Sequence, residues 1–245
     1  ILGVEKDAPL LARAHRFIKD EGGVAAIPIG GKVRLALLDL YACEGVSPVL
    51  PEIWNLPKWF PLHPSHFYCH TRLIFLGMAT LGGQRYRAPR TALTDVLRAE
   101  LYPHGYDSVD FARARTELRE GDLLQPWTKA LDLAYDALRF YDRIGSKGKR
   151  EKALETVRER IRKELRATNH TSISPVSGIL GIVALAVADP HDRDADAAFR
   201  AIDGWIWEDD VDGARIAGAR TATWDTALAA QALGAASAHT DVRRS

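Results

Sequence analysis

Hydrophobic positions recur at helical spacing along most of the chain. Apolar residues three and four positions apart form one-sided stripes, and short connections containing polar residues, glycine or proline separate these segments. The spacing predicts helices over 7–20, 31–43, 65–83, 91–101, 108–118, 124–143, 150–166, 179–188, 194–205 and 224–235. No stretch of the sequence shows the sustained apolar–polar alternation of a half-buried β-strand, so the chain is predicted to be all-α.

The predicted helices are of two kinds. Segment 150–166 is amphipathic and rich in Glu–Arg and Glu–Lys pairs, which is typical of a solvated outer face. Segment 179–188 is almost uniformly apolar, which is typical of a helix buried on all sides. Alternation of buried and half-exposed helices favours an α/α barrel, with an inner and an outer ring. The polar region 205–222 is predicted to be irregular.

Composition narrows the classes of partner. Hydrophobic residues make up 47% of the 245 residues, enough for a substantial core in one large domain or in a piece of a larger one. Lys and Arg total 33 against 32 Asp and Glu, so no basic surplus points to nucleic acid. Cys43 and Cys69 provide neither a disulfide framework nor zinc-site spacing, which favours a reducing compartment.

The sequence shows neither a membrane-spanning segment nor a signal peptide. The apolar run 179–188 is about half of a membrane span, and nothing near the start resembles a signal peptide. A cytoplasmic location without a transmembrane helix is therefore expected. The chain begins with Ile1 inside the approach to a helix, which favours a fragment of a longer protein.

One stretch, 57–72, concentrates residues that can carry chemistry. It contains three prolines, three histidines, a cysteine and several large aromatic residues, and it runs into an apolar segment. The prolines forbid a regular helix before about Ser65. We therefore expect a stiff lead-in that delivers Tyr68, Cys69 and His70 to the first turns of a buried helix.

Two clusters could suggest a metal, and neither is convincing. The acidic run 208–212 lies in a predicted loop without a second acidic motif, and a solvated loop explains it more simply. His63 and His66 flank Pro64, but no third ligand stands at motif spacing. No metal site and no cofactor are predicted.

Several motifs occur in one order along nearly the whole chain. They are Gly22-Gly-Val-Ala-Ala-Ile-Pro28, Tyr41-x-x-Glu44-Gly45, Pro51-Glu52-x-Trp54, Trp59-x-Pro61-x-His63-Pro64, Cys69-His70-x-Arg72, Glu100-Leu101-Tyr102, the run 172–177 and Trp224-Asp225-Thr226-Ala227. Together they resemble the oxidosqualene and squalene cyclases, particularly the lanosterol and cycloartenol synthase group.

The resemblance implies an architecture and a reaction. Such cyclases carry two α/α barrels with the substrate cavity between them, and residues 1–245 would form a single domain corresponding to the central part of the N-terminal barrel region. The implied substrate is an apolar triterpene, oxidosqualene or squalene, cyclised by a proton-initiated carbocation cascade without a cofactor. For the complete enzyme the resemblance also implies peripheral, monotopic attachment to a membrane.

The resemblance also implies roles for individual residues. His70 would face the cavity and stabilise, or finally deprotonate, the carbocation, and Trp224 would stack beneath the developing charge. Tyr68 and Cys69 would line the substrate site together with Trp224. An aromatic face attracts a cation by roughly 0.5–2 kcal/mol, and neutral groups do so without capturing it covalently. From the residues alone, a hydrogen-bonded core histidine is the simpler explanation of His70, and a core tryptophan explains Trp224 as well as a cavity residue does.

One departure limits the expected activity. The family's Asp-Cys-Thr-Ala-Glu motif, which supplies the initiating acid, does not occur in this sequence. We therefore expect this chain alone to be inactive. Two alternatives stay open: a non-catalytic cyclase-like module that binds an apolar ligand, and a metal-dependent terpene synthase that uses the acids around Asp209.

Overall fold

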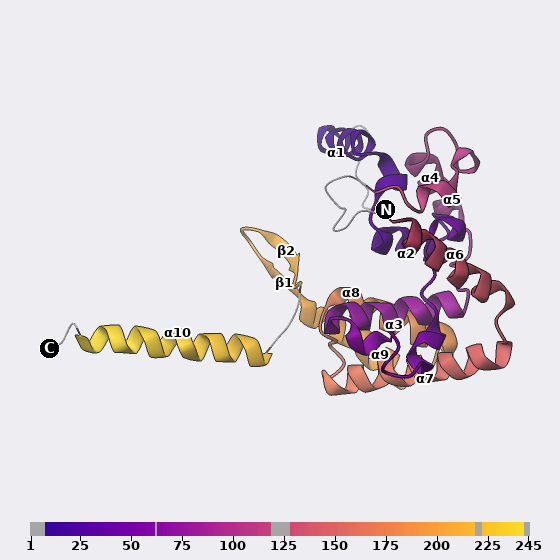
Figure 1. Cartoon of the computed structure of the whole chain (residues 1–245). Coiled ribbons are helices and arrows are strands. Elements are labelled where there is room, and N and C mark those ends of the chain that lie inside the picture. Colours follow the sequence, from indigo (N-terminus) through magenta and orange to yellow (C-terminus); the bar gives the residue numbers. More distant parts are fainter. Residues whose placement is uncertain (1–7, 62, 119–127, 219–221, 243–245) are drawn as a thin grey trace. The chain divides into compact units, whose positions relative to one another are not determined.

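The computed structural model describes residues 8–61, 63–118, 128–218 and 222–242, and these are mostly helical (Figure 1). The chain divides into two compact units. Unit 1 comprises Ile1–Pro57 and Met78–Thr156, and unit 2 comprises Lys58–Gly77 and Val157–Ser245. Two long helices, α3 (Cys69–Gly83) and α7 (Lys147–Ala167), contribute residues to both.

Unit 1 is built around a cluster of aromatic rings. Its other helices are α1 (Pro9–Asp20), α2 (Ile29–Leu37), α4 (Ala92–Leu101), α5 (Phe111–Ala114) and α6 (Lys129–Ile144). The ring of Phe111 packs edge-on against Tyr41 at 4.8 Å and against Tyr102 at 5.9 Å between centroids. The Tyr102 hydroxyl donates to the Leu40 carbonyl at 2.6 Å, so this large polar ring is buried with its hydroxyl satisfied.

A buried lysine ties α2 to the end of α5. The Lys32 side chain is 1% exposed, and its ammonium group donates to the carbonyls of Ala114 at 2.5 Å and Glu117 at 2.7 Å. Burial lowers the pKa of Lys32 to about 8, against an opposing effect of the Glu117 carboxylate. The two carbonyls compensate in part for the water that the ammonium loses.

Unit 2 packs helices closely through glycines. It contains α8 (Pro175–Ala188) and α9 (Arg193–Arg200), which pack against one another, and α10 (Ala222–Val242). A Cβ added at Gly77 on α3 would lie 2.5 Å from Leu180 Cβ, and one at Gly181 would lie 3.2 Å from Ile161 on α7. Glycine at both positions therefore lets α8 approach its neighbours closely.

The buried faces match the predicted periodicity with one qualification. Ala153, Leu154, Val157, Ile161 and Leu165 form the buried stripe of α7, as expected for an amphipathic helix. Helix α8 buries Leu180, Gly181, Ala184 and Leu185, whereas Ile179 is half exposed. The prediction that 179–188 is buried on all sides is therefore wrong for one of its faces.

Side-chain caps fix several helix starts. Thr91 and Thr94 form a reciprocal capping box at α4. Ser174 accepts from the Ser177 N–H at the start of α8, and Asp192 accepts from two N–H groups at the start of α9. The segment before the apolar helix α8 therefore ends in its cap.

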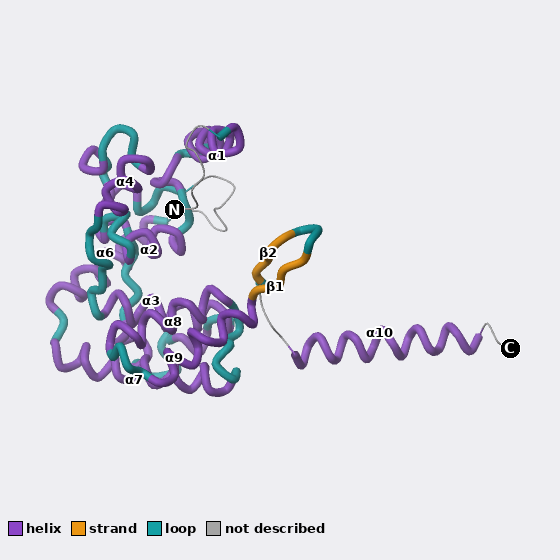
Figure 2. Tube along the Cα trace, turned by 180° about the vertical axis from the view of Figure 1, so that it is seen from behind, coloured by secondary structure: helices purple, strands orange, loops and turns teal. Residues whose placement is uncertain are grey.

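A β-hairpin replaces the predicted irregular connection after Trp205. Strands β1 (Ile206–Asp209) and β2 (Gly213–Ile216) pair antiparallel, and Figure 2 shows them as the orange ribbon. Gly213 adopts φ +68°, and Asp209 accepts from the N–H groups of Val211 and Asp212 in the turn. The strands have four residues each, and β1 has no buried position. They therefore produce no alternation of apolar and polar residues from which the sequence could predict them.

Several predicted boundaries also need correction. Helix α2 ends at Leu37 rather than residue 43, and Asp39 follows with φ +57°, outside helical space. In place of a helix over 108–118, the structure has the short α5. Helix α10 extends to Val242, beyond the predicted end at 235. Asp7 and residues 124–127, included in predicted helices, lie outside the described residues.

Within the described ranges, no helix is both long enough and apolar enough to cross a membrane.

Candidate functional site

The proline-rich stretch forms the predicted stiff lead-in to α3. Pro64–His66 is a 3-10 turn, and the His63 ring nitrogen Nδ1 accepts from the Ser65 N–H at 3.0 Å. His66 Nε2 lies 2.8 Å from the Lys58 carbonyl oxygen. Helix α3 then begins at Cys69, which places His70 in its first turn.

His70 makes one hydrogen bond to a residue far away in sequence. Its Nε2 lies 2.6 Å from the Oγ of Ser174, the residue that caps α8. The imidazole itself is half-buried. The first turn of α3 and the start of α8 are therefore joined through these two side chains.

Ser174 is the first of three buried serines that continue the hydrogen-bonded chain. Its Oγ lies 3.1 Å from the Oγ of Ser177, which lies 2.9 Å from the Oγ of Ser172. Ser172 donates in turn to Glu164 Oε1 at 2.7 Å. All five residues, His70 to Glu164, belong to unit 2.

The far end of this chain is a carboxyl group in an unusual setting. Burial raises the pKa of Glu164, although the hydrogen bonds from the Ser172 hydroxyl and the Ile173 N–H oppose the shift. Ser172, Ser174 and Ser177 are themselves at most 5% exposed. We call Glu164, Ser172, Ser177, Ser174 and His70 the serine chain; it contains a base at each end and three hydroxyl groups between.

The remaining predicted site residues are exposed. Tyr68 and Cys69 flank the start of α3, with Tyr68 74% exposed and Cys69 a free, exposed thiol. Trp224 lies in the first turn of α10 and is 69% exposed. A cavity shared by His70, Tyr68, Cys69 and Trp224 stays a prediction.

The two clusters considered for a metal use their polar atoms within the chain. Arg215 pairs with the carboxylates of both Asp209 and Asp212, and the second contact is 2.8 Å long. The guanidinium of Arg215 also lies over the Trp207 ring, 5.4 Å from its centroid. These contacts give the acidic run a structural role in the hairpin. In the described part of the chain, no group of three or more His, Cys, Asp or Glu side chains is arranged to hold a metal ion.

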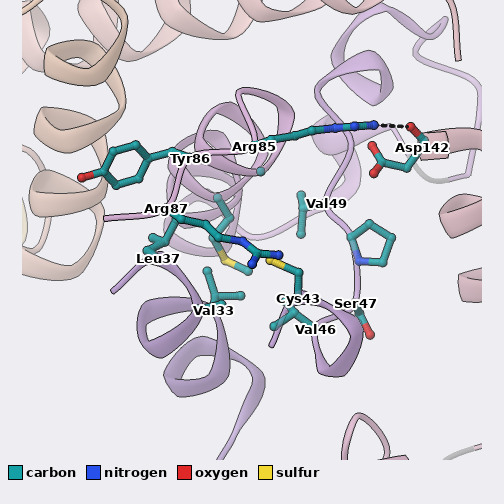
Figure 3. A pocket seen from close by; sticks show the side chains of 14 residues that line it. Val33, Leu37, Cys43, Val46, Ser47, Val49, Arg85, Tyr86, Arg87 and Asp142 are labelled. Atoms are coloured by element: carbon teal, nitrogen blue, oxygen red, sulfur yellow. Dashed lines mark hydrogen bonds between the residues drawn. The ribbon is translucent and has the colours of Figure 1, made fainter. Parts of the chain in front are cut away.

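Unit 1 contains a separate apolar cavity of about 270 Å³. Figure 3 shows its wall of aliphatic side chains, among them Val33, Leu37 and Val49. The Arg87 guanidinium lies beside the Cys43 thiol, and Arg85 reaches across to donate to the Asp142 carbonyl at 3.1 Å. The cavity can therefore accommodate an apolar group next to a positive charge.

Sequence reasoning did not connect Glu164 and the serines with His70. The run 172–177 reads in the sequence as one of the family-like motifs, and Glu164 lies in segment 150–166, which is typical of a solvated helix face. The only local signal is the serine spacing at 172, 174 and 177, which a capping segment already explains. The link to His70 spans 104 residues and depends on tertiary structure.

Comparisons with known proteins match this chain along almost its entire length. The family model of the squalene-hopene cyclase N-terminal domain matches residues 1–211. Lanosterol synthase from Mus musculus is 34% identical over 241 residues, covering 98% of this chain and 33% of the relative. The human enzyme is also 34% identical, over 244 residues with the same coverage. Cycloartenol synthase from Dictyostelium discoideum is 30% identical over 237 residues, covering 95% of this chain and 33% of the relative.

The chain spans about a third of the length of these curated relatives. The matched family domain has an α/α-barrel fold, and the described residues are mostly helical, so the predicted fold class is confirmed. The predicted resemblance is confirmed as well, by the family model and the synthase relatives independently. The chain belongs to the oxidosqualene and squalene cyclase family.

Proposed function

We propose that this chain is part of a triterpene cyclase that converts oxidosqualene or squalene into a polycyclic product. The observation that carries the proposal is the family match over residues 1–211, because it includes the stretch around His70. The lanosterol and cycloartenol synthases among its relatives favour a sterol-forming cyclase. Residues 1–245 would form a single α/α-barrel domain within a larger two-barrel protein.

His70 would act on the carbocation. A neutral imidazole offers a lone pair to a positive charge and, at the end of the cascade, accepts a proton from carbon. The bond to Ser174 supports this role, since it holds one ring nitrogen and leaves Nδ1 for the substrate. Among the described residues, Nδ1 has no hydrogen-bond partner.

Trp224, Tyr68 and Cys69 would line the same cavity. The tryptophan and tyrosine rings would stabilise a migrating cation through their faces, an effect that strengthens when water is excluded. Their exposure supports the proposal in one respect: these side chains are not committed to the core of the described residues. The complete enzyme would close the cavity over them and attach peripherally to a membrane.

The initiating acid would come from the second barrel of the complete protein. Protonation of an epoxide or alkene needs a strong, positioned acid, and no Asp-Cys pair occurs in these 245 residues. The reaction needs no metal or organic cofactor, because the acid supplies the proton and the cavity walls stabilise the charge. The chain alone would be inactive.

The test is cyclisation by the complete protein that contains this chain. We expect it to convert oxidosqualene or squalene into a cyclic triterpene, detected by gas chromatography with mass spectrometry. The 245-residue chain alone, assayed in parallel, should return the substrate unchanged. A complete protein that binds either substrate without turnover, or turnover by the chain alone, would contradict the proposal.

The apolar cavity of unit 1 favours a second candidate function, a module that holds a small apolar ligand without catalysis. Its volume of about 270 Å³ is at or below the lower end of ligand pockets, roughly 300–1000 Å³, so a triterpene would not fit inside it. A medium-chain fatty acid, placed with its carboxylate at Arg87, would fit. Binding of octanoate to the chain, abolished by Val33→Trp and weakened by Arg87→Gln, would support this candidate; equal heats of binding by titration calorimetry for all three proteins would refute it.

A further inference from the structure

The hydrogens of the serine chain can be assigned in a single consistent direction. Ser172 donates to Glu164 Oε1, because an ionised carboxylate only accepts. The Ser172 oxygen can then accept from Ser177, whose hydroxyl also lies 3.2 Å from the Ser174 carbonyl oxygen, and the Ser177 oxygen can accept from Ser174. In this assignment Ser174 gives its one proton to Ser177, so its oxygen accepts from His70.

Ser174 has the capacity for this arrangement. Its oxygen already accepts from the Ser177 N–H at 3.2 Å, and a hydroxyl oxygen has a second lone pair for the His70 N–H. His70 therefore carries its proton on Nε2 and presents the lone pair of Nδ1. A carboxylate at the far end thus determines the tautomer of the histidine in this network.

We infer that Glu164 and the serines 172, 174 and 177 form a proton relay to His70. The relay keeps the proton of neutral His70 on Nε2, so that Nδ1 is the basic nitrogen, and it removes the proton that His70 takes from the final carbocation. The inference rests on the proposed function, in which His70 meets the cation. Glu164 and the serines are positioning residues, since none of them would touch the substrate.

The relay step balances without another reactant. Nδ1 takes the proton from the carbon next to the cationic centre, and the C–H electron pair forms the product's double bond. The Nε2 proton passes to Ser174, and each hydroxyl passes its own proton onward until Glu164 becomes a neutral acid. His70 ends neutral with its proton on Nδ1. After product release the Nδ1 proton leaves to water and the reversed relay returns a proton to Nε2, which restores the starting state.

Glu164 is suited to receive a proton. Burial raises its pKa, which makes the carboxylate a stronger base than an exposed glutamate. Among the described residues, no Arg, Lys or His lies within ion-pair distance of it, so no cation competes for its charge. By contrast, nearby Asp194 is paired with Arg166 and His170, and its pKa is lowered.

The direct test is the tautomer of His70 in the chain labelled with ¹⁵N-histidine. Two-bond ¹H–¹⁵N correlation spectra distinguish the nitrogen that carries the proton from the one that does not, and His70→Gln identifies the signals. We expect the neutral His70 ring to carry its proton on Nε2. A proton on Nδ1 would overturn the relay, because Nε2 would then accept from Ser174.

Two variants test whether Glu164 sets this state. Glu164→Gln replaces the carboxylate with an amide that can donate as well as accept, so we expect the two His70 tautomers to become mixed. Glu159→Gln removes a charge from the same helix outside the serine chain and serves as the matched control, with no change expected. If Glu164→Gln leaves the His70 signals unchanged, the relay is refuted.

Ser177→Ala tests the middle of the chain, since it contacts neither His70 nor Glu164. We expect the same tautomer mixing, with far-UV circular dichroism retained. Should that variant not fold, the wild-type tautomer alone decides the question. These spectra need no turnover, so a failed relay is distinguishable from a failed cyclase assignment, which product analysis addresses.

Discussion

His70 Nε2 and Ser174 Oγ lie 2.6 Å apart, although 104 residues separate them in the sequence. The contact joins the first turn of α3 to the residue that caps α8. It gives the imidazole a defined orientation, which a base in a carbocation cavity needs. It also adds a tertiary contact to a serine that already has a local capping role.

A double-mutant cycle separates these two roles of Ser174. Ser174→Ala should lower the free energy of unfolding by about 1–2 kcal/mol through loss of the cap and of the His70 contact. The coupling between His70→Ala and Ser174→Ala should be about 1 kcal/mol, measured by urea denaturation. Additive effects of the two substitutions would show that the contact contributes nothing to stability.

The close approach of α3 and α8 makes Gly77 sensitive to substitution. An added Cβ at Gly77 would meet Leu180 Cβ at 2.5 Å and the Leu180 backbone at 3.1 Å. We expect Gly77→Ala to destabilise the chain by about 1–3 kcal/mol in thermal or urea unfolding. Gly148→Ala on α7, with open space around the new methyl group, is the control and should be neutral or slightly stabilising. Equal effects of the two would contradict the packing described.

Lys32 gives unit 1 a specific dependence on pH. Its pKa is about 8 in the folded chain against 10.5 ordinarily, so between these values the unfolded chain binds more protons. The free energy of unfolding therefore rises with pH across this window, by about 2 kcal/mol between pH 8 and 10. Below this window Lys32 is protonated in both states and does not contribute to the pH dependence.

The comparison protein is Lys32→Met, which lacks the titrating group. As the pH rises from 8 to 10, the unfolding free energy of wild type should increase relative to that of Lys32→Met. Burial raises the pKa of Tyr41 to about 12, and such groups act in both proteins and cancel in the difference. A difference that stays constant from pH 7 to 10 would show that Lys32 is not buried as described.

Much of the helical architecture could be predicted from the sequence, because the apolar residues of a long amphipathic helix recur every three to four positions. Helix α7 is an example. The hairpin could not be predicted in this way: its strands are short, and ion pairs from Arg215 and the positive φ of Gly213 support it in place of a buried face.

The candidate site was predictable only in part, for a different reason. The residues around His70 stood out by composition and by resemblance. Glu164 looked like one of many charges on an outer helix, and only the fold brings it to Ser172. A hydrogen-bonded chain assembled from three separate segments leaves no periodic signal in sequence.

Trp224 provides a test of the aromatic wall. In the complete cyclase, Trp224→Ala should reduce total turnover and release partly cyclised products, because it removes a cation-facing ring and its packing. Trp224→Phe should retain most of the activity, since a smaller aromatic face remains. The products are measured by gas chromatography with mass spectrometry; an unchanged product profile in Trp224→Ala would remove this residue from the site.

His70→Ala in the complete cyclase measures whether His70 meets the carbocation, as we propose. The variant should keep its fold, verified by circular dichroism and the unfolding midpoint, because the imidazole is only half-buried. Ser65→Ala, in the neighbouring lead-in, is the control and should retain the wild-type products. We expect His70→Ala to shift the products to truncated or differently deprotonated triterpenes. A folded His70→Ala enzyme that makes the wild-type product at the wild-type rate would contradict it.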